Sequence, residues 1–563
     1  MQIGPEGPPT RIGGYNSAMT TPCNIAARLP ELARERPDQV AMRCPGRDGR
    51  YAIALTYAQL DARSDAIAAG LATHGIVRGT RAVLMVRPTP EFFLLMFALF
   101  KAGAVPVLVD PGIDKRALKQ CLDEAAPEAF VGIPLAQFAR VLLGWARSAR
   151  TRITTGKRAW FADATLAQIE HAGEGSGPQL ADTQPDDVAA ILFTSGSTGI
   201  PKGVVYRHRH FVAQIAMMRE AFGIAPGGID LPTFPPFALF DPALGLTSII
   251  PDMDPTRPAK ADPRKLHAAI MRFGVDQLFG SPALMRVLTD YGQALPTIKR
   301  ATSAGAPVPA DVVATLQSLL PPDAQFWTPY GATECLPVAV IEGRELITLR
   351  ERTEHGAGTC VGRPVPPNEV RIIAITDDAI ATWSEVSMMK VGGVGEITVA
   401  GPSATDTYFN RDAQTRAAKI RETLADGSER IVHRMGDLGY FDSEGRLWFC
   451  GRKSQRVVTA TDTLCTEQIE PVFNTHRDVR RTALVGIGKF GAQTPVLCVE
   501  LRDGVNVGEW SRIENELRHS GEGFVHTAAV RMFLRYPKPF PVDIRHNAKI
   551  GREKLALWAA KQA

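Results

Sequence analysis

Six consecutive small polar residues and a lysine form the stretch of this 563-residue chain most suited to binding an anion. They are Thr194, Ser195, Gly196, Ser197, Thr198, Gly199 and, three positions later, Lys202. Glycines let successive backbone N–H groups point into one concavity, and the hydroxyls and the ammonium add donors and a positive charge. The spacing differs from a Walker loop, because Gly203 rather than Ser or Thr follows the lysine. The pattern predicts a polyphosphate site, with a flexible Gly/Ser linker as the alternative.

The segment 194–203 resembles the phosphate loop of the adenylate-forming superfamily, which includes acyl-CoA synthetases, luciferases and the adenylation domains of peptide synthetases. The resemblance covers nearly the whole chain, which in overall sequence is similar to the bacterial β-lactone synthetases of long-chain olefin biosynthesis. It implies an α/β fold with a large N-terminal body of several subdomains, built on mostly parallel, helix-covered sheets. A small mobile α+β C-terminal domain would follow. The implied bounds are 1–452 for the body, 453–456 for the hinge and 457–563 for the C-terminal domain.

Two segments match the superfamily's motifs around the adenine base. One is a turn after a strand-like stretch, and it contains Gly305, Ala306 and Pro307. The other reads Tyr-Gly-Ala-Thr-Glu. In it Tyr330 offers a flat face for a purine, Gly331 permits close backbone approach and Thr333 can donate to a phosphate. A tight turn is the alternative for the second motif alone, and its position after the phosphate loop favours nucleotide binding.

Charged residues complete the implied site. Asp437 matches the aspartate that takes both ribose hydroxyls, and Arg452 matches an arginine near the nucleotide; a plain salt bridge is the alternative for either. Glu334 supplies a carboxylate oxygen suited to Mg²⁺, which accompanies ATP. Lys549 matches the lysine that completes the adenylation site, with a basic surface helix as its alternative. We therefore expect ATP and Mg²⁺ to bind, and Lys549, Lys202 and Glu334 to be catalytic.

These groups suit the conversion of a carboxylate into an acyl-adenylate. The carboxylate attacks the α-phosphorus of ATP and pyrophosphate leaves. Because two anions must meet, the site has to supply positive charge and orientation rather than an acid–base pair.

The apolar segment 234–241 bears on the acid to be activated, and one departure from the superfamily pattern bears on the product. The segment reads Phe-Pro-Pro-Phe-Ala-Leu-Phe-Asp and suits the wall of an apolar pocket. Its Asp241 either caps a turn or holds an amino group, as in peptide synthetases. Residues 459–466 contain no glycine where acyl-CoA synthetases have a Gly-Gly loop beside pantetheine, so the backbone cannot approach as closely.

The overall resemblance to the β-lactone synthetases, together with this glycine-free segment, implies that a long-chain 2-alkyl-3-hydroxy acid is activated as acyl-AMP. Its own 3-hydroxyl then attacks the carbonyl to give a β-lactone and AMP. The main alternative is a long-chain acyl-CoA ligase, and an amino-acid activator is a second. A different class of protein, an inactive nucleotide-binding protein on the same fold, is the third.

Periodicity supports the α/β fold. Residues 81–86, 105–109 and 188–193 predict strands, and residues 91–102 predict a helix. A second helix begins near Thr56, and its buried face is marked by Leu60, Ser64, Ile67 and Leu71.

Composition and charge argue against other classes of protein. The net charge of +5 is spread without long basic runs, so no nucleic-acid partner is expected. The most apolar run, 92–100, is far shorter than a membrane span. Eight cysteines without a CxxC pair indicate neither zinc nor disulfides. We expect a cytoplasmic enzyme whose partners are ATP, a small-molecule acid and possible associated enzymes of the same pathway.

Overall fold

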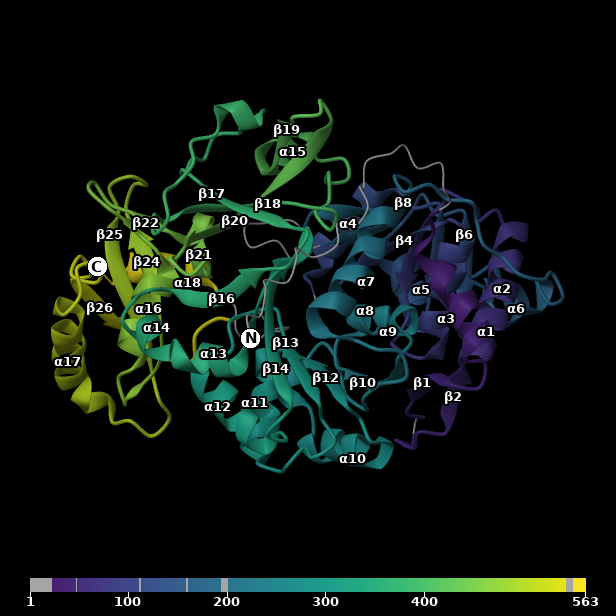
Figure 1. The fold of residues 1–563 in the computed structure, drawn as a ribbon, viewed down its shortest axis with the longest axis horizontal. Helices are drawn as coiled ribbons and strands as arrows, with labels where there is room; N and C mark the ends of the chain where they lie inside the picture. Colours follow the sequence, from purple (N-terminus) through teal and green to yellow (C-terminus); the bar gives the residue numbers. More distant parts are fainter. Residues whose placement is uncertain are drawn as a thin grey trace, which may run out of the picture.

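The computed structural model describes residues 23–46, 48–110, 113–157, 160–193, 201–542 and 550–562. The predicted phosphate-loop residues Thr194 to Gly199, and Lys549, therefore lie outside the described residues. Two large sheets with helices occupy most of the molecule, and a smaller unit lies at one end (Figure 1). Among the described helices, none has both the length and the apolarity needed to cross a bilayer.

A seven-stranded sheet is formed by residues 81–207. Its spatial order is β7 (Ala164–Thr165), β6 (Thr151–Thr154), β5 (Ala129–Gly132), β3 (Arg81–Met85), β4 (Val105–Val109), β8 (Val188–Phe193) and β9 (Gly203–Arg207). Adjacent strands are parallel except at one edge, where β9 returns antiparallel to β8. The predicted strand 105–109 and the predicted strand 188–193 are confirmed at both ends.

Helices cover both faces of this sheet because its strands are apolar on both sides. They are α1 (Arg28–Glu35), α2 (Tyr57–Thr73), α3 (Pro90–Lys101), α4 (Lys115–Ala125), α5 (Pro134–Leu143) and α6 (Leu166–Ala172). Successive side chains of β3 point to opposite faces: Ala82 and Leu84 pack with α2 and α3, and Val83 packs with α4. The four residues predicted to form the inner face of α2 are all buried.

A second, larger sheet contains 14 strands. Its order is β17 (Glu369–Ile373), β18 (Gly395–Ala400), β20 (Glu429–Phe441), β21 (Leu447–Arg452), β16 (Thr359–Pro364), β15 (Cys335–Glu342), β14 (Gln325–Ala332), β13 (Arg300–Ser303), β12 (Gln277–Gly280), β10 (Ile229–Pro232), β11 (Thr247–Ile249), β1 (Val40–Cys44) and β2 (Ile53–Thr56), with β19 (Lys419–Thr423) paired to β20. Its helices are α7 (His208–Phe222), α8 (Pro235–Ala238), α9 (Phe240–Leu244), α10 (Pro263–Phe273), α11 (Pro282–Tyr291), α12 (Ala310–Leu319), α13 (Gly343–Thr348), α14 (Arg350–Glu354) and α15 (Asp412–Ala418).

The direction of the strands changes at β14. From β1 through β11, β10, β12 and β13 to β14 the neighbours are parallel, and from β14 to β17 they are antiparallel. The carboxyl ends of parallel strands share one edge of a sheet, which is where α/β proteins bind ligands. The turn after β13 and the Tyr-Gly motif at the end of β14 therefore lie next to each other.

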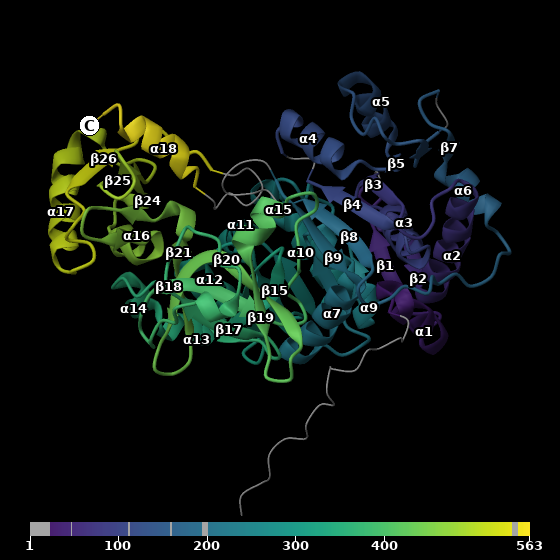
Figure 2. The ribbon, with the colours of Figure 1, turned by 90° about the horizontal axis from the view of Figure 1, so that it is seen from above.

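The C-terminal residues form a unit with its own core. Residues Lys453–Gln455 form a 3-10 turn after β21. Beyond it lie β22 (Val457–Val458), β23 (Thr463–Leu464), α16 (Thr466–Asn474), β24 (Val479–Ile487), β25 (Thr494–Leu501), α17 (Trp510–Glu522), β26 (Met532–Arg535) and α18 (Arg552–Ala559). Two apolar clusters here draw only on residues after 456. The unit lies at one end of the molecule (Figures 1 and 2). The predicted large α/β body and small α+β unit are thus both present, and the hinge at 453–456 stays a prediction.

Candidate active site

Residues predicted to contact adenine and ribose meet at Asp437. The Tyr330 hydroxyl donates to Oδ2 of Asp437 at 2.6 Å, and Nη1 of Arg452 lies 2.9 Å from Oδ1. Asp437 on β20 and Arg452 on β21 are direct partners in the register of the two strands. Burial and the Asp437 charge raise the pKa of Tyr330, so its phenol stays a donor, and the same carboxylate raises the pKa of Arg452. The three side chains form one charge-balanced group around the buried Asp437 carboxylate.

Glycine at two positions allows this edge of the sheet to form. Gly305, in the turn with Ala306 and Pro307, has φ +102°, a backbone conformation that other residues rarely adopt. A Cβ at Gly331 would lie 2.8 Å from the Cys335 carbonyl oxygen, so only glycine lets β14 and β15 approach this closely. The carbonyl of Thr333 accepts from the Tyr206 hydroxyl at 2.5 Å, which fixes the backbone one residue before Glu334.

Glu334 is held by Tyr408, a residue that motif matching missed. The Tyr408 hydroxyl donates to Oε1 of Glu334 at 2.8 Å, and the backbone carbonyl of Glu334 accepts from the Thr405 N–H at 2.8 Å. The ammonium of Lys202 lies 5.0 Å from the centre of the Tyr408 ring, within cation–π range. Burial and the Glu334 charge raise the pKa of Tyr408, so it remains protonated. One side of the Glu334 carboxylate is thereby fixed by a neutral donor.

A buried lysine supports the loop that contains Thr405. Lys419 is 6% exposed, and its ammonium donates to the carbonyl of Thr405. Burial lowers the pKa of Lys419 to about 8, while the charge of Glu334 opposes that shift. No local sequence pattern marked Lys419 or Tyr408, because both act through contacts made far along the chain.

The two groups belong to one site. The negative charge of Glu334 is among the causes that raise the pKa of Arg452, which is itself paired with Asp437. Lys202 reaches Glu334 through the Tyr408 ring. Tyr330, which donates to Asp437, precedes Glu334 by four residues, and Lys202 lies against the Tyr408 ring whose hydroxyl donates to Glu334. These contacts bring Lys202, Glu334 and Asp437 together, and nucleotide binding by them stays a prediction.

For the second predicted lysine, only the neighbouring residues are described. Val542 and Ile550, on either side of residues 543–549, form an antiparallel bridge, and the Gly551 N–H donates to the Pro541 carbonyl at 2.7 Å. Arg552 then forms a buried ion pair with Glu470 of α16 at 2.6 Å. The residues that flank Lys549 are thus anchored to the C-terminal unit.

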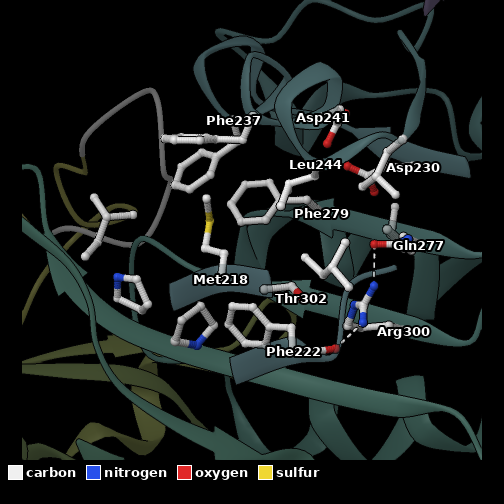
Figure 3. A pocket seen from close by; sticks show the side chains of 17 residues that line it. Met218, Phe222, Asp230, Phe237, Asp241, Leu244, Gln277, Phe279, Arg300 and Thr302 are labelled. Carbon is white, nitrogen blue, oxygen red and sulfur yellow. Dashed lines mark hydrogen bonds between the residues drawn. The ribbon is translucent and has the colours of Figure 1, made fainter. Parts of the chain in front are cut away.

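An apolar cavity of about 90 Å³ lies beside this site (Figure 3). Its lining residues are Met218, Phe222, Ile224, Asp230, Phe237, Phe240, Asp241, Leu244, Leu246, Gln277, Leu278, Phe279, Arg300, Thr302, Pro329, Leu336 and Pro337. Pro329 lines it while the next residue, Tyr330, reaches Asp437, because successive side chains of a strand point to opposite faces. Phe237 and Phe240 line an apolar pocket, as the sequence predicts, and Phe237 stacks on Phe279 with ring centres 4.3 Å apart.

Two buried carboxyl groups form the polar end of the cavity. Burial raises the pKa of Asp230 to about 7, and burial together with the nearby Asp230 charge raises the pKa of Asp241 well above its usual range. Asp241 accepts from the Ser248 hydroxyl of β11. Asp241 is therefore buried at this end of the cavity and makes no side-chain cap for α9.

Replacing Asp437 with asparagine tests the ribose assignment. We expect the KM for ATP to rise about tenfold, because a hydrogen bond to a charged group contributes roughly 1.5–3 kcal/mol. Discrimination between ATP and 2′-deoxy-ATP should also shrink, and steady-state kinetics with both nucleotides measures it. Asp503→Asn, at a residue whose side chain is 98% exposed, is the matched control. Unchanged discrimination in Asp437→Asn would contradict the assignment.

Comparison with known proteins agrees with this geometry. The model of the family described as AMP-binding enzyme matches residues 29–409. An olefin beta-lactone synthetase of Xanthomonas campestris pv. campestris is 72% identical over 98% of this chain and 100% of its own length. One from Stenotrophomonas maltophilia is 69% identical over 97% of this chain and 99% of its own. In fold, the amide bond synthetase McbA of Marinactinospora thermotolerans aligns with a TM-score of 0.76 at 21% identity, over 95% of this chain and 99% of its own. The chain therefore belongs to the AMP-binding enzyme family, whose members form adenylates from ATP.

Proposed function

We propose that this enzyme activates a long-chain 2-alkyl-3-hydroxy acid as its acyl-adenylate and closes it to a β-lactone, with pyrophosphate and AMP as the other products. The observation that carries the proposal is the convergence of Lys202, Glu334 and Asp437 on one site beside an apolar cavity. The two relatives above, similar over nearly their full length, carry the name of this activity.

In the first step, a carboxylate oxygen of the acid bonds to the α-phosphorus of ATP, and the bond to pyrophosphate breaks. Asp437 would bind the ribose, and Tyr330 would pack against the base. Glu334 would hold Mg²⁺: its carboxylate is fixed through one oxygen by a neutral phenol, and Mg²⁺ takes one or two protein carboxylates together with substrate phosphates. When bound, the ion would offset the negative charge of the phosphates.

The two lysines would supply the remaining positive charge. Lys202 would neutralise phosphate charge beside Glu334. Lys549, carried by a C-terminal domain that turns about residues 453–456, would bridge the attacking carboxylate and the α-phosphate. Both roles are electrostatic, since no proton has to move in adenylate formation.

In the second step, the 3-hydroxyl oxygen attacks the activated carbonyl, the C–O bond to AMP breaks and the hydroxyl proton is released. The ring is strained, but the nucleophile is tethered beside the carbonyl, so no association cost arises. The turn of the glycine-free segment supports ring closure over thioester formation. Within this segment Oγ1 of Thr459 accepts a hydrogen bond from the Asp462 N–H at 2.8 Å, so the backbone forms a tight turn. Without glycine, that turn cannot approach pantetheine as closely as a Gly-Gly loop does.

Composition of the pocket and of the chain supports the remaining assignments. Apolar side chains line most of the cavity, which suits an alkyl chain. All eight cysteines are free thiols, which suits the reducing cytoplasm. We also propose that other enzymes of the same pathway associate with it.

Incubation of the enzyme with a 2-alkyl-3-hydroxy acid, ATP and Mg²⁺, without coenzyme A, tests the product. We expect a compound lighter than the acid by one water, together with AMP and pyrophosphate. The matched control is the same acid without its 3-hydroxyl, which should give the adenylate but no lactone. A strict requirement for coenzyme A would identify an acyl-CoA ligase and overturn the proposal.

A further inference from the structure

The helix α5 (Pro134–Leu143) presents four large apolar side chains to solvent, while Gln137 and Arg140 face the protein together with Ala136, Ala139 and Leu143. Leu135, Phe138, Val141 and Leu142 are 66%, 50%, 43% and 71% exposed. They recur at the three- and four-residue spacing of one helix face. Figure 2 shows α5 at the periphery of the molecule. An apolar helix face that the fold leaves in water marks an interaction surface.

The opposite face of α5 is held by polar contacts, so the orientation is specified. Gln137 is fully buried and donates to the carbonyls of Phe130 at 3.1 Å and Ile153 at 2.9 Å. Arg140, 9% exposed, donates to Oε1 of Gln137 at 3.1 Å. Rotating the helix to bury its leucines would leave these strand carbonyls without their donor, which is costly in a low-dielectric interior. The outward apolar face is therefore built into the fold.

An exposed tryptophan lies near α5. Trp160 is 81% exposed and packs edge-on against Phe161. The carbonyl of Phe161 accepts from Nη2 of Arg140 at 3.3 Å, which places the pair beside α5. We call Leu135, Phe138, Val141, Leu142 and Trp160 the α5 patch.

The surroundings of the α5 patch are basic. The 34 residues from Ala129 to Ala162 contain six Lys or Arg and no Asp or Glu, in a chain whose total net charge is +5. Exposed Arg147 lies over the C-terminal end of α5, where a Cβ on Gly144 would be 2.8 Å from its Nη2. Exposed Lys157 follows Gly156, which contacts Pro134 at the other end of the helix.

Acidic residues at the margins cancel only part of this charge: Asp163 pairs with Arg152 and Arg140 is buried, while Arg147, Arg150 and Lys157 stay exposed. Glu128 and Asp163, which bound the basic segment in sequence, are each in an ion pair, with Arg81 and Arg152 respectively. The patch therefore combines an apolar helix face, an exposed tryptophan and flanking cations. These are the features of a helix that lies in the headgroup region of an anionic bilayer.

We propose that the α5 patch docks this enzyme reversibly on an anionic lipid surface. The apolar side chains would enter the headgroup–acyl boundary, and Arg147 and Lys157 would contact lipid phosphates. If the substrate is the long-chain acid proposed above, docking would place the enzyme where such an acid partitions. The docking itself is measured without substrate, so its failure is distinguishable from failure of the proposed function.

Co-sedimentation of the full chain with unilamellar vesicles tests the proposal. We expect binding to vesicles of mixed phosphatidylglycerol and phosphatidylcholine, weaker binding to phosphatidylcholine alone, and loss of the difference in high salt. The triple variant Leu135→Ser, Phe138→Ser, Leu142→Ser should bind at least about tenfold less, because it removes the apolar side chains that would enter the bilayer. Arg147→Gln with Lys157→Gln should reduce only the preference for phosphatidylglycerol.

Matched controls separate docking from general effects. The triple variant Val391→Ser, Val525→Ser, Leu557→Ser removes apolar side chains that are 71%, 95% and 69% exposed elsewhere, and it should bind vesicles as the wild type does. The α5 variant should keep the wild-type thermal midpoint and ATP–pyrophosphate exchange rate, since its three residues are exposed. The proposal is overturned if the wild type ignores vesicles, or if the α5 variant binds them equally well. Loss of self-association rather than vesicle binding in that variant would instead identify an interface between copies of this chain.

Discussion

Replacing Glu334 with glutamine is expected to lower the rate of acyl-adenylate formation by about 10²–10³, the usual cost of losing one preorganised electrostatic contact. The amide keeps the size of the side chain but loses the charge that would hold Mg²⁺. ATP–pyrophosphate exchange measures the rate, and a titration with Mg²⁺ should show a weakened metal dependence.

Two further variants show whether a loss of rate in Glu334→Gln comes from the lost carboxylate charge. Tyr408→Phe keeps the carboxylate and removes only its 2.8 Å donor, so a smaller loss of rate is expected. Glu509→Gln changes an exposed carboxylate in the C-terminal unit and should leave the rate unchanged. A Glu334→Gln enzyme with near wild-type exchange would remove the metal role from this residue.

Lys549→Ala should abolish adenylate formation, a loss of at least about 10²–10³, while ATP still binds. The reason is that the lysine is expected to bridge two anions whose approach is otherwise repulsive, whereas the groups at Asp437 and Glu334 are unchanged. Pyrophosphate release measures the rate, and equilibrium binding of ATP provides the second readout.

Lys554→Ala is the matched control, because Lys554 is an exposed lysine of the same C-terminal segment. It should behave as the wild type does. Near wild-type pyrophosphate release from Lys549→Ala would refute the catalytic role of Lys549. The alternative, a basic surface helix, would then describe this segment.

The elements that position the site were predictable because their signals are local. The apolar runs 105–109 and 188–193 became strands with the predicted bounds, and the helix predicted at 91–102 spans Pro90–Lys101. The turn around Gly305 and the motif around Gly331 carry their own backbone requirement, because one needs a positive φ and the other a close approach. Such requirements are satisfied within a few residues, so sequence alone can express them.

The contacts of the site were not predictable in the same way. Tyr408 and Lys419 lie 74 and 85 positions from Glu334, and only the folding of β15, β19 and the segment between them brings the three together. The sequence predicted Asp241 to be a helix cap or a ligand for an amino group, yet the structure buries it near Asp230 of β10, and burial together with the Asp230 charge raises its pKa. Interactions across a fold depend on topology, which no short window contains.

What the sequence by itself determined is the family, which the comparisons confirm, and the local elements that carry the residues predicted to bind ATP. The tertiary structure alone decided which groups surround them and which way α5 faces. By periodicity, Leu135, Phe138 and Leu142 would belong inside the protein. They lie outside because Gln137 and Arg140 satisfy buried carbonyls, and leaving a buried carbonyl without a donor costs more than exposing a leucine.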